Sequence, residues 1–202
     1  MRFPTASLGQ WNEKSESGVK MILFHGSPVG KIKKLIPNIS NHNSPYVYFS
    51  SNRSVALFYT VRKNWYPYGF VGSEKSLQYT ECYPDGLKDI YQGRRGYIYE
   101  CSGEGLFENP TNIFCAFVSR HEIAPQKEET IEDVYEEILK LEAVGEIKVK
   151  RFFELSEKEK SSNSKMILEE IIKGELVFKK SDYSEFIRTK FPKEWEIAKN
   201  SK

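Results

Sequence analysis

Short apolar and aromatic runs, each ended by a turn signal, dominate the chain from residue 21 to about residue 123. Residues 21–25 are Met-Ile-Leu-Phe-His, and the Gly-Ser-Pro that follows is typical of a buried strand entering a turn. Residues 46–50, Tyr-Val-Tyr-Phe-Ser, predict a second strand. Ser51 then stands where it can cap a short helix over residues 55–59.

Further strand signals occur at residues 77–83, 96–101 and 113–123, between turns rich in glycine and proline. Residues 62–76 are aromatic but have no period, so we predict a loop there. Loops of this kind either cover a cleft or pack on the surface, and the sequence leaves both possibilities open.

From residue 130 onward, apolar positions recur at helical spacing. Thr130 with Asp133 resembles a capping box, and Gly145 closes the helix that this cap begins. One strand over 147–153 and helices over 164–172, 181–191 and 192–200 follow. We therefore predict an α+β fold with three parts: an N-terminal arm (1–20), a main domain (21–153) and a helical C-terminal extension (154–202). The sequence does not decide whether Met21 is an alternative start.

The composition of the 202 residues is that of a globular chain: 39% are hydrophobic, 29% are charged, and the mean hydropathy is −0.56. Thirty Lys and Arg against 28 Asp and Glu leave a charge of +2, which argues against nonspecific binding to nucleic acid. No apolar run reaches the roughly 18 residues of a spanning helix, and no secretory leader is visible. Cys82, Cys101 and Cys115 have no metal-ligand spacing, so we expect a reducing, cytoplasmic setting without a membrane partner.

The three histidines differ in their surroundings. His42 lies in a polar Asn-Ser loop, and His121 lies between Arg120 and Glu122, so a solvated or ion-paired side chain explains each. His25 ends an apolar strand directly before Gly26, where the absence of a side chain lets a ligand approach the backbone. A core histidine bonded to a carbonyl is the alternative for His25.

These residues together resemble a known family. Leu-Phe-His-Gly-Ser at 23–27, then Val-Tyr-Phe-Ser at 47–50, then a helix ending near Tyr59, is similar to the NAD-binding half of the ADP-ribosyltransferase superfamily. The likeness covers residues 21–60 and is closest to the poly(ADP-ribose) polymerase and diphtheria-toxin branch, which has a His–Tyr–Glu triad. It implies a split β-sheet core and NAD as the substrate.

The resemblance also implies a function for each matched position. His25 would bond the adenosine ribose, and the Gly26 backbone would hold the nicotinamide amide. Tyr48 and Tyr59 would stack on the nicotinamide ring, with Phe58 in place of Tyr59 if the helix carries one inserted residue. Two neighbouring hydroxyls complete the predicted NAD-binding set, which is His25, Gly26, Ser27, Tyr48, Ser50 and Tyr59.

The third triad position departs from the family. Asn-Pro-Thr at 109–111 and the strand after it resemble the segment that carries the glutamate, yet the matching position is Ala116. A glutamate there stabilises the cationic transition state, so its loss should slow catalysis. Glu100 is the better of two possible replacements and Glu81 the other, although each also suits an ordinary strand carboxylate.

Three functional hypotheses follow. The first is an enzyme that transfers ADP-ribose from NAD to an unidentified acceptor and releases nicotinamide. The second is a catalytically silent module on the same fold that binds NAD, ADP-ribose or a protein. The third is an RNA-handling or interaction domain unrelated to NAD. The related RNA 2′-phosphotransferases hold a phosphate with arginines, and the sequence offers Arg53, Arg62, Arg94 and Arg95 without placing them in a site.

Overall fold

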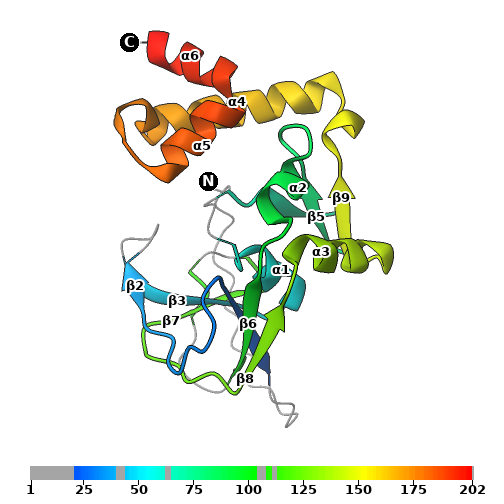
Figure 1. The fold of residues 1–202 in the computed structure, drawn as a ribbon, viewed down its shortest axis with the longest axis vertical. Coiled ribbons are helices and arrows are strands. Elements are labelled where there is room, and N and C mark those ends of the chain that lie inside the picture. The colour runs from blue at the N-terminus through cyan, green and yellow to red at the C-terminus, as the bar shows by residue number, and fades with distance from the viewer. Residues whose placement is uncertain (1–20, 40–43, 62–64, 104–107, 111–112, 202) are drawn as a thin grey trace. The chain divides into compact units, whose positions relative to one another are not determined.

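The strongest apolar runs of the sequence form one antiparallel sheet (Figure 1). The computed structural model describes residues 21–39, 44–61, 65–103, 108–110 and 113–201. The strand order is β2-β3-β1-β6-β8, and β7 also pairs with β3. The strands are β1 (Ile22–Ser27), β2 (Asn38–Ile39), β3 (Pro45–Ser50), β6 (Gly96–Ser102), β7 (Ala116–Ser119) and β8 (Lys127–Ile131).

Strand β1 is paired very differently along its two edges. Along β6 it is registered over its whole length, from Ile22 opposite Ser102 to Ser27 opposite Tyr97. Along β3, the described part of the sheet registers one pair, Phe24 opposite Ser50. Beyond that pair the β1–β3 ladder does not continue, and β3 pairs with β7 along residues 47–50.

The core of this sheet lies on the face that carries Leu23, Val47 and Phe49. Residues of the loop after β1 cover it, among them Leu35, which is 3% exposed. Tyr99 fastens this loop, because its hydroxyl donates to Val29 O at 2.8 Å. The same oxygen accepts the Ile32 N–H at 3.2 Å. Alternation along the strands therefore produces one apolar face, and the loop after β1, held by the Tyr99 hydroxyl, covers it.

Helix α1 (Arg53–Phe58) follows β3 directly. Its N-cap is Asn52 rather than the predicted Ser51, since the Asn52 side chain accepts from the backbone N–H groups of Ser54 and Val55. All residues from Ser54 to Phe58 are buried. A six-residue helix is too short to be stable alone, so tertiary contacts must keep it in place.

A second sheet has the order β4-β5-β9, with β4 (Tyr68–Val71) antiparallel and β9 (Ile147–Lys150) parallel to β5 (Ser76–Thr80). C-terminal helices follow, and α4 packs on α6 and α5 on α6. The bounds of the remaining elements are α2 (Gly86–Tyr91), α3 (Val134–Ala143), η1 (Phe152–Glu154), α4 (Glu157–Lys173), η2 (Leu176–Phe178), α5 (Asp182–Lys190) and α6 (Pro192–Asn200).

The described residues group into two compact units. One contains those within 2–62 and 91–141, including the β1–β3 sheet and α1. The other contains those within 63–90 and 142–202, including the β4-β5-β9 sheet and α4 to α6. The sequence-based division into 21–153 and 154–202 is a different partition and stays a prediction. The predicted arm over 1–20 lies outside the described residues.

The α+β fold with C-terminal helices agrees with the sequence analysis, and several boundaries are corrected. Part of the predicted 62–76 loop is β4, the strand predicted over 113–123 shortens to β7, and α4 begins at Glu157 rather than at residue 164. Asp133, not Thr130, caps α3, because its carboxylate accepts the Tyr135 N–H at 2.9 Å. None of the helices in the described ranges is long and apolar enough to cross a membrane.

Candidate functional site

His25 is fixed by a hydrogen bond to the neighbouring strand. Its Nδ1 lies 2.8 Å from Tyr48 O, and because a carbonyl only accepts, Nδ1 carries the proton. The ring lies between two aromatic rings, with centroids 5.9 Å from Phe49 and 6.4 Å from Tyr99. Burial lowers the pKa of His25 below its usual 6.5, against the opposing effect of the Tyr48 bond. The imidazole is therefore neutral at pH 7, and its Nε2 is an acceptor.

Gly26 contacts the helix that follows β3. A Cβ atom placed on it would lie 1.9 Å from Ala56 O and 3.2 Å from Tyr59 Cβ. A side chain cannot fit there, since backbone atoms of α1 occupy the space. The glycine thus allows close packing of α1 on β1, whereas the sequence indicates the approach of a ligand.

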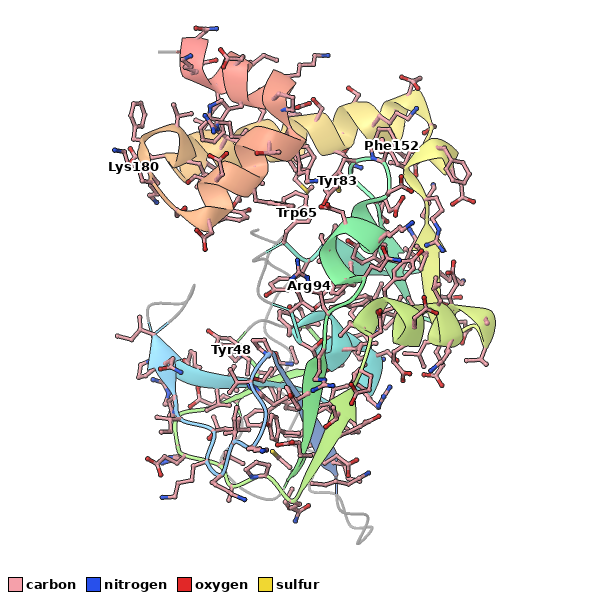
Figure 2. All side chains as sticks on the ribbon, viewed as in Figure 1. Tyr48, Trp65, Tyr83, Arg94, Phe152 and Lys180 are labelled. Atoms are coloured by element: carbon pink, nitrogen blue, oxygen red, sulfur yellow. The ribbon has the colours of Figure 1, made fainter. Side chains whose placement is uncertain are left out.

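Two of the predicted tyrosines lie on the same face of the sheet as Gly26. Phe24 is registered opposite Ser50, so Tyr48, two residues before Ser50, shares the face of Phe24 and Gly26. Figure 2 labels Tyr48 on this sheet. Tyr59 follows α1 on this face and is 40% exposed. His25 is on the opposite face, and it reaches the Tyr48 backbone rather than the Tyr48 ring.

The two serines of the predicted site are buried, and each hydroxyl accepts a hydrogen bond from a nearby backbone N–H. Ser27 is 6% exposed, and its hydroxyl accepts the Val29 N–H at 3.1 Å. Ser50 is 4% exposed, and its hydroxyl accepts the Asn52 N–H at 3.0 Å. These bonds shape the turn after β1 and the start of α1.

The position that the resemblance assigns to the glutamate opens a strand next to β3. Ala116 is the first residue of β7 and is registered opposite Ser50. The same cross-strand row runs on from Ser50 to Phe24 and then to Glu100. Glu100 is therefore on the same face as Ala116, but three strand spacings away, roughly 14 Å. Its carboxylate accepts from Lys127 Nζ at 2.8 Å.

Glu81, the other possible replacement, supports the backbone of its own unit. It is 5% exposed, and its two oxygens accept the backbone N–H groups of Leu87 at 3.0 Å and Phe152 at 3.1 Å. These bonds stabilise the starts of α2 and η1, so both carboxylate oxygens are used in structural hydrogen bonds.

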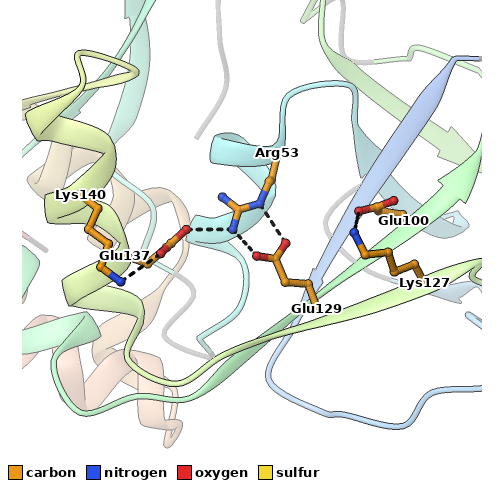
Figure 3. Close-up of polar contacts among 6 residues, drawn as sticks. All are labelled: Arg53, Glu100, Lys127, Glu129, Glu137 and Lys140. Carbon is orange, nitrogen blue, oxygen red and sulfur yellow. Dashed lines mark hydrogen bonds and ion pairs between the residues drawn. The ribbon is translucent and has the colours of Figure 1, made fainter.

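Arg53 carries contacts that the sequence did not disclose. Its guanidinium donates to both oxygens of Glu129, from Nε at 3.0 Å and from Nη2 at 2.6 Å, and also to Glu137 at 2.9 Å (Figure 3). The pair raises the pKa of Arg53 and lowers that of Glu129. Glu129 lies 76 residues away, and no local pattern indicates such a partner. Arg95 pairs with exposed Glu132.

The remaining candidates lie elsewhere. His121 and Arg94 are exposed, whereas His42 and Arg62 are outside the described residues. A cavity of about 360 Å³ lies among 179–188 and Trp195, and it contains none of the predicted site residues. In the described part of the chain no group of His, Cys, Asp and Glu is arranged to hold a metal ion, and the three cysteines are free and buried.

Comparison with protein-family models, with curated proteins and with solved structures found no match for this chain. The function is therefore inferred from the residues and their geometry alone.

Proposed function

We propose that the β1–β3–β7 region binds NAD and that the protein is an ADP-ribosyltransferase-like enzyme that transfers ADP-ribose to an acceptor and releases nicotinamide. The observation that supports this best is the arrangement of side chains where β1 and β3 meet. Gly26, Tyr48 and Tyr59 share one face of the sheet, and the His25 ring donates a hydrogen bond to the Tyr48 carbonyl of the neighbouring strand. The strand that begins with Ala116 is the next neighbour of β3.

Each residue has a chemical property that suits this ligand. Tyrosine rings stack on flat heteroaromatic rings, and Tyr48 and Tyr59 supply two rings on the face of Gly26, with Tyr59 next to this glycine. The neutral His25 accepts a hydrogen bond at Nε2 when Nδ1 donates to Tyr48, so it is suited to a ribose hydroxyl. The leaving nicotinamide would depart from a cationic ribose, which hydrogen bonds around the ribose stabilise.

Calorimetric titration of NAD, with nicotinamide release followed in the same sample, tests the proposal. His25→Ala removes the Nε2 acceptor and the hydrogen bond to Tyr48 O, so we expect NAD binding at least about tenfold weaker and turnover lost. Tyr48→Ala should act in the same direction through the lost stacking. His121→Ala, which truncates an exposed histidine, is the matched control and should bind as the wild type does. Wild-type affinity in both site variants would refute the assignment.

Ala116 favours the silent binding module as a second candidate. No acid stands at this position, and the nearest candidate in its row, Glu100, is bonded to Lys127. Removing one such stabilising group from an enzyme costs about 3 to 4 kcal/mol in the transition state. A silent module would bind NAD with the same dependence on His25 and Tyr48 but would release no nicotinamide.

Nicotinamide release by the wild type separates the two candidates, and Ala116→Glu tests whether the acid missing at this position limits the rate. Ala116 is partly buried at the start of β7, and a carboxylate there would point to the face that carries Tyr48. We expect nicotinamide release to rise by about tenfold or more if the missing acid limits the rate. Ala124→Glu adds the same charge at an exposed position of the same unit and should change nothing. An unchanged rate in Ala116→Glu, with NAD still bound, would show that this position is not the catalytic one.

A further inference from the structure

Helix α1 is positioned by contacts at both of its ends. At its start Asn52 caps two backbone N–H groups, and Arg53 bonds two carboxylates on other elements. At its end Ala56 O abuts Gly26, and the same carbonyl accepts the Tyr59 N–H at 3.0 Å. The six residues between these ends form less than two turns, so a displacement at one end is transmitted to the other.

The Arg53 contacts join three elements that are distant in the sequence. Glu129 lies on β8 and Glu137 on α3, and the side chains of all three residues are only 21 to 33% exposed. The guanidinium engages Glu129 with two nitrogens, a geometry that fixes orientation as well as distance. Figure 3 shows the guanidinium between the two carboxylates.

The carboxylate that Arg53 binds on β8 and the proposed nicotinamide contacts lie on the same face of the sheet. Glu129 is registered opposite Ile98, and Ile98 opposite Gly26, so all three share the face of Tyr48. Arg53 thus ties α1 to the row of the sheet that contains Gly26. His25 lies on the other face, and none of its described contacts involves α1.

We propose that Arg53 is a positioning residue for the nicotinamide side of the site: by holding α1 against β8 and α3, it sets Tyr59 beside Gly26 and Tyr48. The proposal rests on the NAD-binding function given above. Its consequence is a site with two separable halves. The nicotinamide half depends on the ion pairs of Arg53 with Glu129 and Glu137, and the ribose contact of His25 does not.

The test compares two ligands that differ by the nicotinamide group. Arg53→Gln keeps a polar side chain but removes the charged guanidinium that bonds both Glu129 and Glu137, and Glu137 then keeps its ion pair with Lys140. We expect NAD to bind about fivefold or more weakly, because small misplacements of a positioning element have large effects. ADP-ribose, which lacks nicotinamide, should bind within about twofold of its wild-type affinity. A role confined to stability would affect both ligands alike.

Two further variants serve as a milder substitution and as a control. Arg53→Lys retains the charge but lacks the paired N–H donors of the guanidinium. It should weaken NAD binding to an intermediate degree, and this can be measured if Arg53→Gln does not fold. Arg95→Gln breaks an exposed ion pair of the same unit and should leave both affinities unchanged. Equal weakening of the two ligands, or no weakening of NAD, overturns the inference. If the wild type binds neither ligand, the proposed function fails first, and this inference with it.

Discussion

At the scale of single residues, the surroundings of His25 constrain its protonation. Its Nδ1–H is committed to Tyr48 O, and its surroundings disfavour the charged ring. A partly buried histidine that is held neutral makes folding sensitive to acid, because the unfolded chain takes up the proton more readily than the folded protein does. The group has a folded pKa below the unfolded value of about 6.5, so its contribution to stability is complete above pH 6.5 and is lost as the pH falls.

His25→Asn should therefore reduce the acid sensitivity of the protein. Asparagine retains an N–H donor for Tyr48 O but cannot be protonated in this range. We expect the fall in Tm between pH 7 and pH 5 to be smaller in His25→Asn than in the wild type. His121→Asn is the control, since that side chain is exposed, and its fall should match the wild type. Identical pH profiles for His25→Asn and the wild type would contradict the environment described for His25.

The candidate residues themselves could be found from the sequence, but their bonds could not. The His-Gly pair, the two tyrosines and the departure at Ala116 are all visible in short motifs. The partners of Arg53 are 76 and 84 residues away, and nothing in the local pattern marks them. The close contact of Gly26 with Ala56 O likewise depends on how α1 packs, which no motif states.

At the scale of elements, the contact between β1 and α1 provides a stability test. The methyl group of Gly26→Ala would meet a backbone oxygen at 1.9 Å, so α1 must move. Overpacking of this kind costs about 1 to 3 kcal/mol, which lowers Tm by roughly 2 to 4 °C per kcal/mol in a protein of this size. Gly69→Ala is the matched control on β4, where a Cβ meets nothing within 4 Å. A Tm for Gly26→Ala equal to that of Gly69→Ala would contradict the packing.

Elements with a strong apolar pattern were predictable, and those held by distant contacts were not. The predictions for β1, β3 and β6 and for the two last helices agree with the structure, and β9 begins as predicted but ends at Lys150 rather than at residue 153. Strand β8 was missed because Lys-Glu-Glu-Thr-Ile has the charged composition of an edge strand. Helix α2 was missed because it begins in a Pro-Asp-Gly turn, and Glu81 satisfies one of its first N–H groups from outside the helix.

At the scale of the whole molecule, the two compact units are not successive segments of the chain. Each is built from separated stretches, so the chain leaves the first unit after residue 62, returns at residue 91 and leaves again after residue 141. Composition and periodicity could show a change from strands to helices near residue 130. They could not show that residues 63–90 belong with the C-terminal helices, because that association is formed by long-range pairing.

The parallel pair of β5 and β9 has a consequence for how the protein is made. Leu77 is registered opposite Ile147, which is synthesised 70 residues later. At ordinary translation rates of about 5 to 20 residues per second, β5 leaves the ribosome roughly 4 to 14 s before its partner. During that interval β5 lacks the partner that pairs with this edge in the folded protein. A nascent chain that ends short of residue 147 therefore exposes an edge strand that the folded protein covers.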